Sequence, residues 1–596
     1  MFIVGDYMLG KIIGIEGNTV LLKLGINLSE VQNIINLYVV FDDGETKNVG
    51  EIVDIKTDVA YINLVGSLDG DKFLFGVSKK PSFKSAVKLI SKEKIHSILG
   101  MSDYVEKRDL YIGTSPLYDG LKIGVNINEF FSKHFAIFGA TGSGKSCSVA
   151  RIFQNLFEKN NSIAYKANIL IFDAYGEYHD AFKDLGKKVP EISFKAYTTN
   201  TNDPDIEKVM IPLWLLSVDD IALLLEANSR TLLPIIEKAM KLVTIFSKEE
   251  DKVIKSKNDI IARALLDILA SGKSPAQIRD QIFSVLSHYN TKDLNLETPV
   301  YQPGYTRQLK QCLLIDNSGK IREMELLTTF ISQFLTENVE LSLPDGSFKY
   351  TLQDLYNAFE FALISEGVLN SDKVFDEYNI LKVRLRSLLN SDYAKFFEGD
   401  YVSISDFIKE ILTAPNGRKA QIVNFNINYV DDRFAKTLTK IYSRLFFEYA
   451  KGLKNRASLP IHIILEEAHR YVQNDSDVDV IGYNIFDRIT KEGRKYAVLL
   501  GLISQRPSEL STTALSQCSN FLMFKLLHPL DIEYISQMIP NMTAEIATKV
   551  KVLQPGTCIA FGSGFNLPQL VKLDMPDPAP SSSNCDISST WFIDRN

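Results

Sequence analysis

The sequence is poor in the features that mark disulfide-rich and zinc-binding proteins. Its 596 residues include only five cysteines. They are scattered and form neither a CxxC pair nor a metal-ligand spacing, so neither a disulfide framework nor a zinc site is indicated. We expect free thiols in a reducing compartment. The five are Cys147, Cys312, Cys518, Cys558 and Cys585.

Long apolar runs and net positive charge are also missing. No stretch approaches the ~18 apolar residues of a membrane span, and the short N-terminus MFIVGDYMLGK is unlike a signal peptide. We therefore expect a cytoplasmic protein without a membrane partner. The formal net charge is −7 and the pI about 5.7, so no global basic field draws the chain to nucleic acid. A basic channel on an acidic body is compatible with this balance.

The composition is that of an ordinary globular protein, and the expected secondary structure changes along the chain. The composition is 45% hydrophobic and 23% charged, and the length predicts more than one domain. Short β segments come first, then strands alternating with helices, then a long helical stretch, then strands again. We predict a small β-barrel for assembly or partner docking, an α/β core in two parts, a helical insertion between them, and a C-terminal arm. The respective ranges are 1–110, 111–180 with 416–577, 181–415, and 578–596.

Two of these regions carry specific patterns. The stretches GKIIGIEGNTVLLKLG and GEIVDIKTDVAYINLVG repeat one two-strand unit, which is typical of a small barrel. In the helical stretch, Lys382, Arg384 and Arg386 form either a DNA-facing stripe or, as we favour, a solvated face.

The strongest chemical signal is GATGSGKS, which fits G-x-x-x-x-G-K-[ST] between a strand and a helix. Glycines let the backbone wrap phosphate oxygens, and the helix N-terminus adds positive potential. Lys145 would reach the β- and γ-phosphates, and Ser146 would offer its hydroxyl to Mg²⁺. The predicted ATP-binding residues are Gly139, Ala140, Thr141, Gly142, Ser143, Gly144, Lys145, Ser146 and Cys147.

Two adjacent carboxylates follow the apolar strand LPIHIIL. An enzyme that hydrolyses a nucleotide bound at a glycine-rich loop of this kind needs a carboxylate at the end of a neighbouring strand to hold Mg²⁺. It also needs a group that orients or deprotonates the attacking water. Because successive residues of a strand point to opposite sides, we assign Glu466 to Mg²⁺ and Glu467 to the water. The alternative is that one acts and the other makes a structural hydrogen bond.

Three further stretches place polar residues near the same sheet edge. In IFDAYGEY, Asp173 and Glu177 either approach the nucleotide or belong to a turn held by Asp173 and Gly176. Gln505 ends the strand of LLGLISQRPSEL, where it would contact the γ-phosphate or the water. In ring ATPases an arginine from one subunit completes the next subunit's site, and Arg494 is the first candidate and Arg506 the second. Surface salt bridges are the alternative for both.

Taken together, GATGSGKS, DAYGEY, ILEEAHR and KEGRKYAVLLGLISQRPSEL make the sequence resemble HerA-type translocases of the HerA/FtsK branch of P-loop motor ATPases. The resemblance implies a RecA-like P-loop ATPase core with an N-terminal small β-barrel and a helical insertion. It also implies a homohexamer that uses ATP and Mg²⁺ to move on double-stranded DNA. The barrel face would dock a nuclease, as archaeal members do with NurA, or an NAD-hydrolysing effector, as in bacterial antiphage systems.

The resemblance also marks two positions that need attention. The family usually has Asp where this chain has Glu466, which bears on the metal geometry. Lys133 stands before the P-loop strand, where relatives often carry a basic residue, and it would contact phosphate from the sensing side. A second reading of the whole chain is a regulatory ATPase scaffold that activates a partner enzyme with little motor activity. The acidic net charge favours this second reading.

Overall fold

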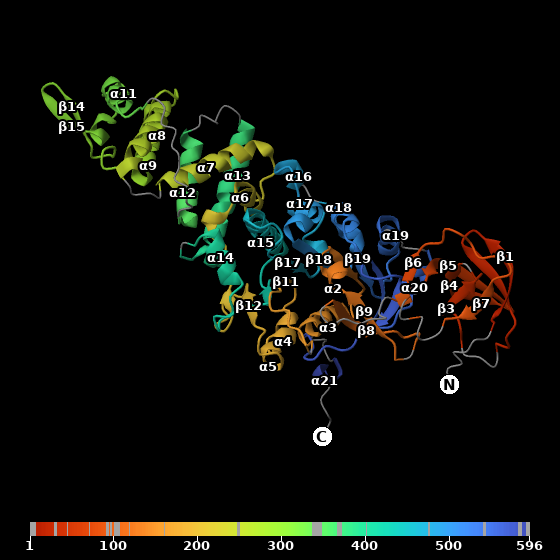
Figure 1. Cartoon of the computed structure of the whole chain (residues 1–596). Helices are drawn as coiled ribbons and strands as arrows, with labels where there is room; N and C mark the ends of the chain where they lie inside the picture. The colour runs from red at the N-terminus through yellow and green to blue at the C-terminus, as the bar shows by residue number, and fades with distance from the viewer. Residues whose placement is uncertain are drawn as a thin grey trace.

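The structure is a computed structural model, and it describes residues 8–28, 33–44, 46–70, 72–90, 95, 98–99, 108–118, 120–159, 161–246, 251–336, 349–365, 372–400, 402–474, 477–539, 544–581 and 587–591. An N-terminal antiparallel sheet lies at one end, a large sheet covered by helices lies in the middle, and a helical arm extends from the other side (Figure 1). Cys585 and most of the predicted C-terminal arm lie outside the described residues, apart from 578–581 and α21 (Ile587–Trp591).

The N-terminal sheet has seven strands in the order β1-β2-β5-β4-β3-β7, with β6 paired to β5. Its ends meet, because Leu9 N donates to Val87 O at 2.9 Å and Met8 bridges Lys88. Alternating side chains such as Val20, Leu22 and Ile62 are fully buried, so one face of the sheet points inward. The sheet curls around the core that these side chains form. The strands are β1 (Gly10–Glu16), β2 (Thr19–Leu24), β3 (Tyr38–Asp42), β4 (Lys47–Lys56), β5 (Val59–Asp69), β6 (Lys72–Phe75) and β7 (Ala86–Leu89).

The core sheet has twelve strands in the order β13-β12-β16-β11-β17-β18-β10-β19-β20-β21-β8-β9. In this spatial order, the first eight strands, from β13 through β19, are parallel to one another. The pairs from β19-β20 to β8-β9 are antiparallel. The strands are β8 (Asp109–Thr114), β9 (Lys122–Asn126), β10 (Phe135–Phe138), β11 (Ile169–Asp173), β12 (Phe194–Thr198), β13 (Glu207–Lys208), β16 (Ile422–Asn426), β17 (Ile461–Leu465), β18 (Val498–Ser504), β19 (Asn520–Met523), β20 (Thr557–Gly562) and β21 (Gln569–Lys572).

Helices cover both faces of this sheet, which is why its central strands are continuous apolar runs. In β10, Ala136 and Phe138 belong to one core, while Phe135 and Ile137 belong to the other. The covering helices are α2 (Ile127–Phe131), α3 (Lys145–Phe157), α4 (Tyr178–Phe182), α5 (Leu185–Lys188), α15 (Asp432–Gly452), α17 (Ile485–Glu492), α18 (Thr512–Ser516), α19 (Pro529–Met538) and α20 (Ala544–Lys551). The α/β class predicted from the sequence is confirmed.

The helical arm begins later than the predicted boundary at residue 181. Strand β12 pairs with β16 in register Phe194↔Ile422, so residues up to Lys208 belong to the core sheet. Local periodicity could not show this pairing, because the partner strand lies more than 200 residues away. The arm holds α6 (Val218–Leu224), α7 (Leu233–Phe246), α8 (Asp251–Leu269), α9 (Pro275–His288), α10 (Leu309–Cys312), α11 (Met324–Ser332), α12 (Leu352–Ser365), α13 (Asp372–Leu389), α14 (Ile404–Ile411) and the hairpin of β14 (Pro299–Gln302) and β15 (Tyr305–Gln308).

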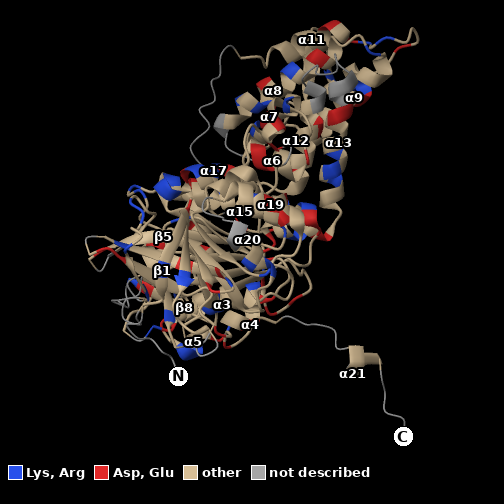
Figure 2. Cartoon of the chain, turned by 90° about the vertical axis from the view of Figure 1, so that its right-hand side faces the viewer, with Lys and Arg blue, Asp and Glu red and all other residues tan. Residues whose placement is uncertain are grey.

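Positive charges on the arm are interspersed with negative ones (Figure 2). On α13, Arg384 Nη1 donates to Leu225 O at 2.9 Å and to Glu226 O at 2.5 Å, and Lys382 pairs with Glu360 at 3.4 Å. These contacts lie within the arm and give the DNA-facing stripe no support. None of the described helices is both long enough and apolar enough to cross a membrane.

Candidate functional site

The glycine-rich loop lies between β10 and α3 at the carboxyl edge of the core sheet. Gly142 and Gly144 have φ of +74° and +101°, which side chains rarely adopt. A Cβ at Gly144 would also lie 3.0 Å from the amide nitrogen of Gly556, so the loop is packed as well as turned. Lys145 Nζ donates to the Gly139 and Ala140 carbonyls at 2.7 and 3.0 Å. The loop therefore folds around the Lys145 ammonium, whose two carbonyl partners phosphate oxygens would replace.

Glu466 follows β17 directly and reaches the loop. Its Oε1 accepts a hydrogen bond from Ser146 Oγ at 3.2 Å. The side chain is buried, and Oε2 has no hydrogen-bond partner among the described residues. Strand β17 is not the immediate neighbour of β10, contrary to the sequence expectation, because β18 lies between them. The longer glutamate side chain spans this gap to the Ser146 hydroxyl.

Glu467 is turned away from Glu466 by the backbone. Strand β17 ends at Leu465, and Glu467 has left-handed φ and ψ of 48° and 46°, just before the short helix η5 (Ala468–Arg470). The predicted strand alternation is therefore not what separates the two carboxylates. A left-handed non-glycine residue costs about 1 kcal/mol or more and is typical of functional turns. Glu467 Oε2 lies 3.2 Å from His469 Nδ1, in a geometry that makes no hydrogen bond.

Burial sets the protonation of this cluster. Desolvation raises the pKa of Glu466 well above its usual range, and the charges of Asp173 and Glu177 raise it further. Desolvation also raises the pKa of Glu467, opposed by the charge of Lys145. The pKa of Lys145 is lowered by burial, with the two glutamates opposing that effect. The site thus holds two buried carboxyl groups beside one buried lysine, and a divalent cation there would favour the ionised form of the carboxyl groups.

A magnesium ion fits the residues present. Ser146 offers a hydroxyl, and the unpartnered Oε2 of Glu466 is a buried acceptor beside it. No group of three or more His, Cys, Asp or Glu side chains suited to a metal occurs in the described part of the chain. An ion here would take most of its oxygen ligands from phosphates and water, as Mg²⁺ does in nucleotide sites.

Gln505 joins the same edge from β18. Its Oε1 accepts a hydrogen bond from Thr141 Oγ1 at 2.7 Å. Thr141 lies in the glycine-rich loop, so the amide stands where the phosphates would end. The structure brings Gln505 together with Lys145, Ser146 and Glu467, as the sequence predicted for a ligand site at the strand ends.

Asp173 has a different kind of environment. Its Oδ1 accepts from the amides of Gly176 and Glu177 at 2.8 and 3.0 Å. Its Oδ2 accepts from the amide of Tyr178 at 2.9 Å and from Asn424 Nδ2 at 3.2 Å. Of the two readings left open, the contacts support the turn held by Asp173 and Gly176.

The same turn places two side chains beside the loop. The charge of Glu177 raises the pKa of Cys147, second to burial, and it also acts on Lys145, so it lies near the nucleotide edge. Tyr178 is fully buried and its hydroxyl has no partner among the described residues. Burial, and then the charge of Glu466, raise the pKa of this phenol. Sequence reasoning missed Tyr178, although the second tyrosine of DAYGEY was a signal for it.

Three predicted residues do not meet the loop of their own chain. Arg494 Nη2 donates to Gln517 O at 3.1 Å and to Ser519 Oγ at 2.6 Å, and Arg506 Nη1 pairs with Glu509 at 2.8 Å. Lys133 Nζ pairs with Glu129 at 2.6 Å, one helical turn away. The arginine roles across subunits stay predictions, and the Lys133 contacts support an ordinary surface ion pair.

Comparisons with known proteins point to one group. Residues 110–446 match the family described as "Helicase HerA, central domain". A probable DNA double-strand break repair helicase HerA from Methanocaldococcus jannaschii is 23% identical over 557 residues, which cover 92% of this chain and 91% of the relative. The DNA double-strand break repair helicase HerA of Pyrococcus furiosus is 21% identical over 574 residues, covering 96% and 85%.

Solved structures give a weaker likeness. The plasmid coupling protein TrwB in complex with ADP and Mg²⁺ is 12% identical and has a TM-score of 0.41, with 82% of this chain and 92% of that chain covered. At this TM-score the strand order described above, rather than the likeness, defines the fold.

Proposed function

We propose that this chain, which belongs to the HerA helicase family, is an ATP-driven motor that moves along double-stranded DNA. The family model matches more than half of the length of the chain. The relatives named as DNA double-strand break repair helicases support the DNA substrate. As a member of that family the protein is a P-loop ATPase.

One observation carries the proposal. Five side chains from three separate segments meet at one sheet edge: Lys145 and Ser146 after β10, Glu466 and Glu467 after β17, and Gln505 after β18. Open α/β sheets bind ligands at this edge. Two buried carboxylate oxygens there have no hydrogen-bond partner among the described residues. Buried polar atoms are usually hydrogen-bonded, so these two oxygens at a ligand-binding edge are candidates to contact a metal, a water or the substrate.

The residues divide the work as follows. Lys145 would exchange its two carbonyl contacts for the β- and γ-phosphate oxygens, and the loop amides would bind the same phosphates. Ser146 and Glu466 would hold Mg²⁺, which supplies positive charge that stabilises the transferring phosphoryl group. Glu467 would accept the proton of the attacking water, and Gln505 would orient that water. The raised pKa of Glu467 makes it a stronger base than an exposed glutamate.

The assembly is the second part of the proposal. Arg494 contacts Gln517 and Ser519 instead of the glycine-rich loop of its own chain, and in a homohexamer it would serve the site of a neighbouring copy. The curled N-terminal sheet would be the small barrel that docks a nuclease or an NAD-hydrolysing effector, in DNA processing or antiphage defence. The domain ranges predicted from the sequence are retained here, with the core extended through Lys208.

A regulatory ATPase scaffold is the second candidate, and two observations favour it. The net charge is −7, and two of the basic residues on α13, Lys382 and Arg384, make contacts within the arm. Such a protein would hydrolyse ATP in response to its partner and not to DNA.

The rate of ATP hydrolysis with and without blunt duplex DNA separates the two. A motor predicts a severalfold stimulation that falls as salt rises, because phosphate contacts release counterions. An unchanged rate together with no DNA binding would favour the scaffold. A rate of zero under all conditions, with intact nucleotide binding, would contradict both.

A further inference from the structure

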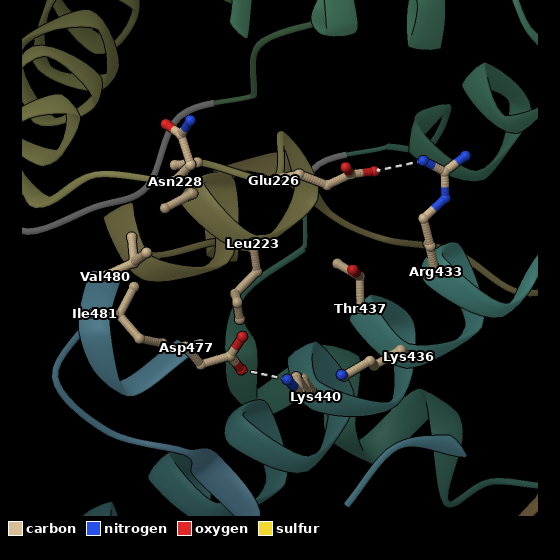
Figure 3. Close-up of a pocket in the computed structure, with 12 residues that line it drawn as sticks. Leu223, Glu226, Asn228, Arg433, Lys436, Thr437, Lys440, Asp477, Val480 and Ile481 are labelled. Atoms are coloured by element: carbon tan, nitrogen blue, oxygen red, sulfur yellow. Dashed lines mark hydrogen bonds and ion pairs between the residues drawn. The ribbon is translucent and has the colours of Figure 1, made fainter. Parts of the chain in front are cut away.

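Charged side chains line a hollow between the helical arm and α15, and they pair across it (Figure 3). Arg433 lies 3.4 Å from Glu226, which joins the core to the arm, and Lys440 pairs with Asp477 inside the core. These charges are paired with one another. A different kind of polar contact lies at the turn after β17, where His469 follows the two glutamates.

The imidazole of His469 lies between two segments of the proposed active site. It belongs to η5 and is 11% exposed. Its Nδ1 is hydrogen-bonded to Ser504 Oγ at 3.1 Å, and Ser504 is the fully buried last residue of β18. The same nitrogen lies 3.2 Å from Glu467 Oε2, although the angle makes no hydrogen bond there. One ring nitrogen therefore touches both the carboxylate of Glu467 and the end of the strand that Gln505 follows.

Ser504 connects this imidazole to the rest of the site. Its Oγ accepts from the amide of Arg506 at 3.0 Å, which closes the turn around Gln505. Its carbonyl oxygen accepts from the amide of Gly139 at 3.3 Å, at the start of the glycine-rich loop. The Gln505 side chain in turn accepts from Thr141 of that loop at 2.7 Å. A displacement of Ser504 would therefore move the Gln505 side chain relative to the glycine-rich loop.

The contact with Glu467 favours one tautomer of the ring. Burial lowers the pKa of His469, against the charge of Glu509, so near pH 7 the neutral ring carries one donor and one acceptor. An unprotonated Nδ1 would turn its lone pair toward a carboxylate oxygen 3.2 Å away. The proton is therefore favoured on Nδ1 whenever Glu467 is ionised, and Nδ1 then donates to Ser504 Oγ.

Glu467 has a side chain that needs such a neighbour. Its backbone lies in the left-handed region with φ of 48°, and a residue persists there only where the surrounding structure holds it. The amide of Arg470 donates to the Glu467 carbonyl at 2.8 Å, which fixes the backbone of the turn. Oε2 of the side chain has no hydrogen-bond partner among the described residues. The ring of His469 limits where that oxygen can move.

We propose that His469 is a positioning residue that keeps the carboxylate of Glu467 and the side-chain amide of Gln505 at a fixed separation around the attacking water. It holds Ser504 through Nδ1 while its ring bounds the Glu467 side chain. This role rests on the proposed functions of Glu467 and Gln505 in ATP hydrolysis. In it His469 contacts neither the nucleotide nor the water. The kcat should therefore depend on His469, whereas the KM for ATP, which the glycine-rich loop sets, should not.

Steady-state ATP hydrolysis by the full chain at saturating Mg²⁺ tests this role, and it is measured without DNA so that it does not depend on motor activity. His469→Ala is expected to lower kcat by about ten- to hundredfold, the cost of a small misplacement of reacting groups, and to keep the KM for ATP within about threefold. His469→Asn should recover much of the loss, because its amide places a donor near the position of Nδ1. His462→Ala is the matched control. His462 lies on the same strand, with Nε2 2.7 Å from Phe131 O, and its loss should lower the thermal unfolding midpoint without lowering kcat.

Ser504→Ala tests the same contact from the other side and serves if His469→Ala folds poorly. It should lower kcat, and adding it to His469→Asn should remove the recovery, because the amide then has no hydroxyl to bind. A kcat within about twofold of the wild type in Ser504→Ala or in folded His469→Ala would overturn the proposal, as would a loss that His469→Asn does not recover. Full hydrolysis by Glu467→Gln would contradict the proposed base as well, whereas a normal kcat in His469→Ala beside an inactive Glu467→Gln would contradict the positioning role alone.

Discussion

Two turns at the carboxyl edge of the core sheet carry buried carboxylates, and they are built in opposite ways. In the turn after β11, the oxygens of Asp173 accept four hydrogen bonds, three of them from backbone amides. In the turn after β17, Glu466 accepts one from Ser146 and keeps Oε2 without a partner among the described residues. The strands are adjacent, so the difference does not come from their place in the sheet.

The comparison separates a carboxylate that holds structure from one that awaits a ligand. A buried carboxylate that accepts several amide hydrogen bonds stabilises its turn, whereas an unsatisfied one costs about 1–3 kcal/mol or more. A fold keeps the second kind where function requires it. Asp173 is the scaffold that sets the turn of Glu177 and Tyr178, and the β17 pair would do the chemistry.

The largest effect on ATP hydrolysis is expected when Lys145, the cation of the glycine-rich loop, is replaced. Lys145→Ala should abolish ATP turnover, because the phosphates lose their preorganised positive charge. Steady-state hydrolysis and binding of a labelled ATP analogue measure it. Lys187→Ala, which removes an exposed lysine paired with Asp184 at 2.8 Å, is the control. Full activity in Lys145→Ala would refute the loop assignment.

Removing the base of the β17 pair should come next. Glu467→Gln is expected to keep ATP binding and to lose about two to four orders of magnitude in hydrolysis, the usual contribution of a general base. Single-turnover hydrolysis at saturating Mg·ATP measures the loss. If Glu467→Gln hydrolyses ATP at the wild-type rate, the base is another group.

The pH profile sharpens the same assignment. Burial raises the pKa of Glu467 above the usual value of 4.5, and only the ionised form accepts a proton. The wild-type rate should therefore fall as pH decreases, with a midpoint above 4.5, and Glu467→Gln should lose this limb. A rate that stays constant as pH falls to 4.5 in a folded protein would contradict the assignment.

A smaller effect is expected at Tyr178, the buried phenol at the end of the turn after β11. Tyr178→Phe should raise the Mg²⁺ concentration needed for half-maximal turnover by about two- to fivefold, because one hydrogen-bond donor beside Ser146 and Glu466 is lost. Tyr442→Phe is the control, since that fully buried hydroxyl donates to Met210 O at 2.6 Å, away from the loop. The same Mg²⁺ requirement in both variants would make Tyr178 merely structural.

The smallest effect on ATP hydrolysis is expected at Asp173, whose carboxylate holds the turn after β11. Asp173→Asn should lower the thermal unfolding midpoint, because one oxygen becomes an NH2 that cannot accept from the N–H groups it faces, and the other loses its charge. Its turnover well below that midpoint should stay within about threefold of the wild type. If Asp173→Asn instead abolishes hydrolysis without lowering stability, Asp173 acts in catalysis and its assignment as a structural carboxylate is wrong.

The sequence predicted what depends on local residues. GATGSGKS predicted the strand, loop and helix around Lys145, and the adjacent glutamates predicted carboxylates near Ser146. It did not predict β18 between β17 and β10, or β12 in the core, because those pairings join distant segments. The left-handed turn at Glu467 was also missed, since glutamate carries no turn signal. For Asp173 both readings were open, and only the four donors around its oxygens favoured one.

The proposed mechanism requires separate roles for Glu466 and Glu467. A Mg²⁺ titration of ATP hydrolysis by the wild type, Glu466→Gln and Glu467→Gln in one assay tests this division. Glu466→Gln is expected to need severalfold more Mg²⁺ and to recover much of its rate when the ion is in excess, because it loses charge toward the metal. Glu467→Gln is expected to stay inactive at every Mg²⁺ concentration. Two superimposable titration curves would contradict the division of labour.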